Sequence, residues 1–121
     1  MATPDLLDAQ LGLHATALRM RQQRLDIIAS NIANAATPGF KARDMDFRAA
    51  LAEAQTSSPA GPLSPGAAIK YRLPVQTSLD GNTVELATEQ AQFAETAMHY
   101  RASLSFLTGR IQTLMTALKG E

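Results

Sequence analysis

The side chains best suited to chemistry in this sequence do not form a group that could act together. The two histidines, His14 and His99, lie far apart, and neither has a partner at the spacing of a metal-binding motif. His14 falls inside a heptad pattern, where a histidine is more often a packed residue than a ligand. Asp44 and Asp46 lie two residues apart beside two basic residues, which indicates a solvated charged patch rather than an acid and base pair. The sequence therefore predicts no enzyme, no metal site and no cofactor.

The remaining charges and the glycines exclude further classes of function. The glycines of the middle segment do not have the spacing of a phosphate-binding loop, so no small-molecule substrate is predicted. Lys and Arg together number 11, as do Asp and Glu, so no net field attracts nucleic acid or an anionic membrane. A cluster of Arg19, Arg21 and Arg24 is interpreted as a solvated or inter-subunit salt-bridging face. The absence of cysteine excludes a disulfide framework and a thiolate zinc site.

Size and composition favour one helical domain. The chain has 121 residues, only 5% of them aromatic and none of them Trp, so its core consists mostly of Leu, Ile, Met and Ala. Such a core suits helices packed on helices. Residues 1–5 lack the basic and apolar regions of a cleaved signal peptide, and no apolar run is long enough to span a bilayer. We therefore expect a protein that is not itself transmembrane and that, if it leaves the cytoplasm, is carried by something other than a cleaved signal.

A heptad stripe predicts a long N-terminal helix over roughly residues 4–35, which would be about 45–50 Å long. Thr3 and Pro4 form a suitable start, as a cap and a first helical residue. The stripe consists of Leu7, Leu11, His14, Leu18, Arg21, Leu25, Ile28, Ile32 and Ala35.

A second heptad stripe predicts a C-terminal helix over residues 83–121. Asn82 and Glu85 have the spacing of a capping box at its start. Gly109 lowers helix propensity without ending the pattern. The stripe consists of Leu86, Gln90, Phe93, Ala97, Tyr100, Leu104, Leu107, Ile111, Leu114 and Leu118.

The middle segment, residues 37–82, is predicted to be largely irregular. Residues 44–54 could form a short helix with Phe47, Leu51 and Ala54 on one side. Residues 55–66 have the Pro, Gly and Ser content of a linker. Residues 69–75 alternate apolar and polar side chains, which predicts a short edge strand.

The two terminal helices are expected to pack on each other, because each carries a heptad stripe. The predicted fold is all-α: two long terminal helices form an antiparallel coiled-coil-like hairpin, and an irregular Pro/Gly-rich middle holds at most a short helix or strand. We expect one discontinuous domain, with residues 1–36 and 83–121 forming its helical core. The residues expected to pack the helices together are Leu18, Leu25, Ile28, Ile32, Phe93, Tyr100, Leu104, Leu107, Ile111 and Leu114.

The apolar faces of the two helices are too broad for the pair to cover alone. One alternative is an intramolecular bundle in which the middle segment supplies further helices. Its Pro, Gly and Ser content argues against this. Assembly with other subunits is the favoured interpretation.

Residues 30–40, with the sequence Ser-Asn-Ile-Ala-Asn-Ala-Ala-Thr-Pro-Gly-Phe, connect the first helix to the middle segment. Ile28 and Ile32 share a helix face, which places the start of this stretch in the last turns of the helix. Pro38 and Gly39 then predict a type II turn, in which Gly39 takes a positive φ.

This stretch resembles the N-terminal signature of bacterial flagellar rod and hook proteins. The Lys-Ala-Arg-Asp-Met-Asp-Phe run at 41–47 and the Asp-Gly-Asn-Thr-Val-Glu-Leu run at 80–86 resemble the rod proteins of the basal body in particular, and the short length fits a proximal-rod subunit. The resemblance covers both ends of the chain and little of the middle.

The resemblance implies a structural subunit whose terminal helices polymerise into the drive shaft that transmits torque from motor to hook. Its partners would be copies of itself, other rod proteins, and the basal-body proteins near the membrane ring and the export gate. It would reach the periplasm-spanning rod through the flagellar type III apparatus, without a cleaved signal peptide. A non-catalytic cytoplasmic adaptor that binds partner helices is the alternative.

We expect the signature residues to lie at an edge of the helix pair and to contact the next subunit, with Gly39 needed for its positive φ. These residues are Ser30, Asn31, Ile32, Ala33, Asn34, Thr37, Pro38, Gly39, Phe40, Asp80, Gly81 and Asn82.

Overall fold

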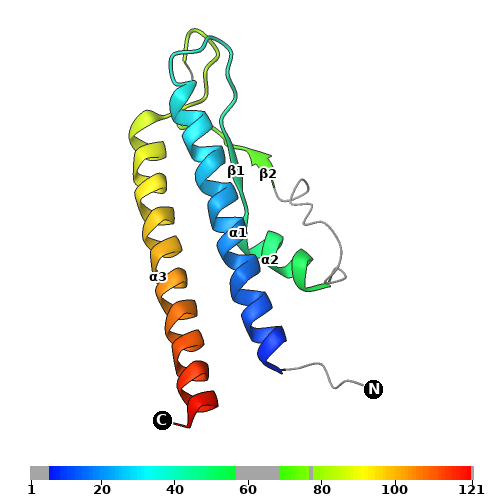
Figure 1. Cartoon of the computed structure of the whole chain (residues 1–121). Coiled ribbons are helices and arrows are strands. Elements are labelled where there is room, and N and C mark those ends of the chain that lie inside the picture. The colour runs from blue at the N-terminus through cyan, green and yellow to red at the C-terminus, as the bar shows by residue number, and fades with distance from the viewer. Residues whose placement is uncertain (1–5, 57–68, 77, 121) are drawn as a thin grey trace.

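The computed structural model describes residues 6–56, 69–76 and 78–120. These residues form two long terminal helices, one short helix and two short strands (Figure 1). The elements in chain order are α1 (Leu6–Ala33), β1 (Arg43–Met45), α2 (Phe47–Thr56), β2 (Ile69–Tyr71) and α3 (Leu86–Lys119). The mostly helical fold and its two long terminal helices agree with the prediction. The predicted helix start at Pro4 and most of the predicted linker lie outside the described residues.

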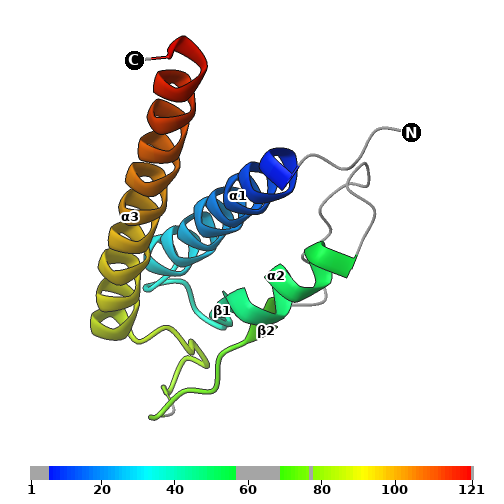
Figure 2. The same cartoon turned by 90° about the horizontal axis from the view of Figure 1, so that it is seen from below.

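The long helices α1 and α3 lie side by side. In Figure 1 the chain runs up α1 to one end of the molecule and down α3 from that end, and Figure 2 shows the two axes diverging toward the end of α3. Far from the shared end, the His14 and Phe106 rings still meet, with their centroids 4.7 Å apart. No helix among the described residues is long and apolar enough to cross a membrane.

The described parts of the middle segment contain more regular structure than predicted. β1 and β2 pair antiparallel, with Arg43 opposite Tyr71 and Met45 opposite Ile69. The strand predicted over residues 69–75 is thus present over Ile69–Tyr71 only, and it has a partner that the sequence did not indicate. The predicted helix over residues 44–54 is wrong at its start, because β1 extends to Met45 and α2 begins at Phe47. The cause is local: the Asp46 carboxylate accepts the Ala49 N–H at 3.2 Å, which caps the helix at Asp46.

The hydrophobic core lies between α1, the small sheet and α2. Met20, Met45 and Ala50 are buried at its centre. The predicted face of α2 packs against this centre, so α2 covers part of the apolar surface of α1 within the chain. The partly buried residues around the centre are Ile27, Phe47, Leu51, Ala54 and Ile69.

The residues that α3 buries in its first half are polar. Glu89 and Thr96 are the buried side chains of the helix, while Phe93, Leu104 and Ile111 remain more than a third exposed. The predicted apolar stripe of α3 thus lies partly in solvent. Among the other predicted packing residues, Ile28 is buried, and those of intermediate burial are Leu18, Leu25, Ile32, Tyr100, Leu107 and Leu114. Packing of the exposed members stays a prediction for an assembled state.

Candidate functional site

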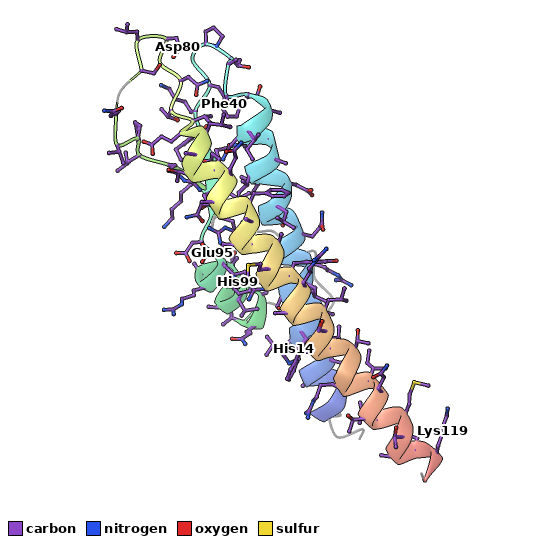
Figure 3. The ribbon with its side chains drawn as sticks, turned by 90° about the vertical axis from the view of Figure 1, so that its left-hand side faces the viewer. His14, Phe40, Asp80, Glu95, His99 and Lys119 are labelled. Carbon is purple, nitrogen blue, oxygen red and sulfur yellow. The ribbon has the colours of Figure 1, made fainter. Side chains whose placement is uncertain are left out.

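The two signature runs meet at one end of the helix pair. Figure 3 shows Phe40 and Asp80 close together where α1 ends and α3 begins. The Gly39 N–H donates to the Asp80 carbonyl at 2.9 Å, and the Thr83 N–H donates to the Phe40 carbonyl at 3.0 Å. We call residues 34–42 and 78–83 together the apex clasp. It joins two segments about 40 residues apart in the chain through backbone hydrogen bonds.

The turn at residues 37–40 has the predicted geometry. The Phe40 N–H donates to the Thr37 carbonyl at 3.3 Å, and Gly39 has φ +75°. Gly81 faces it with φ +77°, and a Cβ atom on Gly81 would lie 3.7 Å from the Gly39 Cα atom. Residues other than glycine rarely adopt this backbone conformation, so both positions favour glycine.

Asn82 satisfies backbone groups at the end of α1. Its Nδ2 atom donates to the carbonyl oxygens of Asn34, Ala35 and Thr37 at 3.0, 3.0 and 2.8 Å. These carbonyls belong to the turn that directly follows α1, beyond the last residue of the helix. The Asn82 side chain is buried, and its Oδ1 atom accepts the Val84 N–H at 2.7 Å. Asn82 therefore fixes the position of the end of α1 relative to the start of α3.

The predicted capping box at the start of α3 is wrong. The cap residue is Glu85, it makes no side-chain cap hydrogen bond, and the helix begins at Leu86. The Asn82 amide is used at the end of α1 instead, and the Glu85 carboxylate accepts the Val75 N–H at 2.5 Å. Contacts with distant parts of the chain have replaced the local cap.

Asn31 links α1 to both β1 and α3. Its Nδ2 atom donates to the Arg43 carbonyl at 2.6 Å and to the Glu89 carboxylate at 3.0 Å, while its Oδ1 atom accepts the Arg43 N–H at 3.1 Å. The side chain is 1% exposed. The Asn31 side-chain amide thus pairs with both the backbone N–H and the backbone carbonyl of Arg43, as a residue of a neighbouring strand would.

Two arginines and two carboxylates complete a partly buried polar network. Glu89, which is fully buried, accepts a hydrogen bond from Arg72, and Arg72 also reaches the Asp44 carboxylate at 2.6 Å. Arg24 pairs with Asp44 at 3.0 Å and donates to the Gln92 amide oxygen at 2.7 Å. The polar network comprises Arg24, Asn31, Asp44, Arg72, Glu89 and Gln92. Its charges balance, and it ties α1, β1, the residue after β2, and α3 together.

The structure corrects the interpretation of two charged residues in this network. Asp44 was expected in a solvated patch and Arg24 on a solvated or inter-subunit face, but both are partly buried and pair with each other. Burial by itself raises the pKa of Asp44. Hydrogen bonds from Arg24, from the Met45 amide and from Arg72 outweigh that effect and hold the pKa below its usual value. The same Asp44 contact raises the pKa of Arg24, so the pair stays ionised at neutral pH.

The lowered pKa of Asp44 predicts a loss of stability in acid. A group whose pKa is lower in the folded state stabilises the fold fully above its unfolded pKa, which is 3.8 for an aspartate. It loses that contribution as pH falls toward the folded pKa. We expect the free energy of unfolding in urea to fall between about pH 5 and pH 3. The fall should be smaller in Asp44→Asn, which cannot titrate. If the free energy of unfolding fell equally with pH in the wild type and in Asp44→Asn, the Asp44 carboxylate would not be the source of the acid sensitivity.

Asn82→Ala is expected to lower the free energy of unfolding by about 2–3 kcal/mol, because it leaves carbonyls of the turn after α1 without their donor inside the clasp. The measurement is chemical unfolding followed by circular dichroism. Asn34→Ala is the matched control: its side chain donates to the Ser30 carbonyl and is not buried, so we expect a loss of about 1 kcal/mol or less. Equal losses in the two variants would be evidence against the capping role of Asn82.

The structure separates the predicted signature residues into two groups. Asn31 and Asn82 are buried and hydrogen-bonded within the chain. The exposed group consists of Ala33, Thr37, Pro38, Gly39 and Asp80. Residues of intermediate burial are Ser30, Ile32, Asn34, Phe40 and Gly81. Sequence reasoning missed Arg72, Glu89 and Gln92, although a glutamate and a glutamine three residues apart on a heptad helix are a signal for a polar contact face.

The site holds structural elements together. Within residues 6–56, 69–76 and 78–120, no three His, Asp or Glu side chains are placed to hold a metal ion. The carboxylates of the polar network are already bound by arginines. What the arrangement can do is keep two long helices in one fixed relation.

Comparison with known proteins identifies relatives along nearly the whole chain. The profile of a family described as "Flagella basal body rod protein" matches residues 11–41, which cover most of α1 and the first side of the clasp. A protein of Cereibacter sphaeroides named "Flagellar basal body rod protein FlgB" is 52% identical, over 93% of this chain and 95% of its own. Proteins with the same name from Escherichia coli and Salmonella typhimurium are 43% and 40% identical, each covering at least 95% of both chains.

Proposed function

Since the chain belongs to the flagellar basal body rod protein family, we infer that it is a structural subunit of the rod in the bacterial flagellar basal body. The observation that carries this function is the 52% identity to a basal body rod protein over 93% of the chain. The fold supports it physically, because a subunit of a rigid shaft needs long helices held in a fixed relation. The clasp and the polar network supply that relation.

The finer role is that of a proximal-rod subunit that transmits torque from motor to hook. In the assembled rod, α1 and α3 act as an antiparallel coiled-coil-like hairpin, and the exposed members of the α3 stripe pack on neighbouring helices. The exposure of Phe93, Leu104 and Ile111 in the single chain supports this packing. Interlocked long helices resist twisting because slipping them would unpack many side chains at once.

The neighbours are copies of this chain, other rod proteins, and the basal-body proteins near the membrane ring and export gate. Residues 1–36 and 83–121 form the axial core, and residues 37–82 form the middle segment between them. Export proceeds through the flagellar type III apparatus. The exposed tip of the clasp, with Thr37, Pro38, Gly39 and Asp80, offers the next subunit a contact surface.

Deletion of the gene, followed by complementation, tests the function. The deletion strain should not swim, and isolated basal bodies from it should lack a rod. A plasmid copy of the wild-type chain should restore both. A deletion strain that swims normally and builds complete rods would show that the chain is not a required rod subunit.

A further inference from the structure

The contact between α3 and α1 buries a polar stripe of α3. Glu89, Thr96 and Ser103 follow one another at seven-residue steps, so they lie on one side of the helix. Glu89 is 0% exposed, Thr96 is 1% exposed, and Ser103 is of intermediate burial. We call these three residues the inner stripe. The Thr96 hydroxyl has no hydrogen-bond partner within the described residues, so its burial does not stabilise the contact.

A neighbouring stripe of α3 is apolar and lies in solvent. Leu104, Ile111 and Leu118 also repeat at seven-residue steps, and they are 40–88% exposed. We call them the outer stripe. Leu104 follows Ser103 directly, and successive residues are about 100° apart around a helix, so the two stripes are about 100° apart. Apolar burial alone would favour the opposite arrangement, with the outer stripe against α1.

A rotation of α3 about its own axis would exchange the two arrangements. Tyr100, Leu107 and Leu114 lie between the two stripes on the helix surface and are of intermediate burial. They therefore stay in the contact with α1 whichever stripe is buried beside them. A turn of about 50° would move the inner stripe outward and the outer stripe toward α1. The observed rotation thus needs a cause other than the burial of apolar side chains.

The polar network provides that cause. Its two members on α3, Glu89 and Gln92, both lie on the side of the inner stripe. Glu89 accepts hydrogen bonds from Asn31 and Arg72, and Gln92 accepts one from Arg24 at 2.7 Å. The donors belong to α1 and to the residue after β2. Turning the inner stripe outward would pull both acceptors away from these donors.

We propose that the polar network sets the rotation of α3, with Glu89 as the positioning residue, and thereby keeps the outer stripe on the outside of the helix pair. In coiled coils, a buried polar contact can fix the register of helices at a cost in stability. The His14 ring meets Phe106, which lies on the same side of α3 as the inner stripe, so this contact favours the same rotation. The inference rests on the proposed function, since the outer stripe belongs to the surface that packs on neighbouring helices in the rod.

Maleimide labelling of single cysteines tests the rotation, because the natural chain contains no cysteine. Thr96→Cys reports on the inner stripe and Leu104→Cys on the outer stripe, each in the purified full-length chain. With the network intact, Leu104→Cys should react about tenfold faster, because Thr96 is buried and Leu104 is 44% exposed. Arg72→Met, added to each variant, removes the arginine partner of the buried Glu89 carboxylate. Glu89 should then turn toward water, which makes Leu104→Cys slower and Thr96→Cys the faster of the two.

Two further substitutions complete the design. Glu89→Ala removes the carboxylate itself and should move the two labelling rates in the same directions as Arg72→Met. Glu95→Ala is the matched control, since Glu95 is exposed on the same helix and its loss should leave the ratio of the two rates unchanged. Circular dichroism measures the helix content of every variant.

A rise in the Thr96→Cys rate without a fall in the Leu104→Cys rate would overturn the proposal. That result, with or without a loss of helix content, would mean that the network only holds the helices together. Unchanged rates in both Arg72→Met and Glu89→Ala would also overturn it. Because the labelled chain is purified, either failure leaves the rod function intact. Failure of the rod function itself is detected by the deletion strain alone.

Discussion

Glu89→Ala is expected to lower the free energy of unfolding by about 3 kcal/mol, because it takes one of two carboxylate partners from the partly buried Arg72 and an acceptor from the buried Asn31 amide. Arg72 and Asn31 both donate to the Glu89 carboxylate, which is fully buried. After the substitution, Arg72 keeps only Asp44, and Asn31 loses one acceptor. Domains of this size are stable by about 5–15 kcal/mol, so the loss would be a large share of the total stability.

Urea unfolding followed by circular dichroism measures the effect of this change. Glu95→Ala is the matched control, since Glu95 lies on the same helix, is exposed, and should change stability by about 0.5 kcal/mol or less. Glu89→Gln should fall between the two, because its amide oxygen can still accept one hydrogen bond but carries no charge. If Glu89→Ala were as stable as Glu95→Ala, the polar network would not hold the helices together.

Gly39→Val is expected to abolish swimming while the chain is still produced. Gly39 has φ +75°, and a β-branched residue in that conformation costs about 1–3 kcal/mol. Relieving the strain would move the turn away from Asp80, whose carbonyl accepts the Gly39 N–H. The clasp would then no longer fix the end of α1 against the start of α3. The exposed tip of the clasp, which we propose contacts the next subunit, would be displaced with it.

Swimming in soft agar, with immunoblotting for the chain, measures this result. Gly39→Asn should retain partial swimming, since asparagine tolerates positive φ better than valine. Gly109→Ala is the control within a helix, because the added Cβ would have no other part of the chain within 4 Å beyond its own helix backbone. The strain that carries it should swim normally, and the substitution should stabilise α3 by about 1 kcal/mol. Normal swimming of the Gly39→Val strain would show that the geometry of the clasp is not required for the function.

The two long helices could be predicted from the sequence because their signal is local. A stripe at heptad spacing repeats within each helix and needs no knowledge of distant residues. The turn at Pro38 and Gly39 is equally local, and its φ followed from the residue types. The family could be predicted as well, because the runs at residues 30–47 and 80–86 resemble those of rod proteins.

The contacts between distant segments could not be predicted in the same way. The pairing of Arg43 with Tyr71 joins strands separated by α2, and no residue pattern sets that register. Asn82 precedes a helix and fits a local cap, yet its amide donates to carbonyls of the turn that follows α1. Glu89 is an ionisable residue, which usually indicates solvent, and its burial depends on Arg72 coming from the middle segment.

The most direct test of the rod function is a reconstruction of the intact basal body by electron cryomicroscopy. The density of the rod should contain this chain, with α1 and α3 paired along the shaft and Asn31, Arg72 and Glu89 joined inside each subunit. Density for the chain outside the rod would contradict this assignment. So would a rod complete at side-chain resolution and built entirely from other proteins.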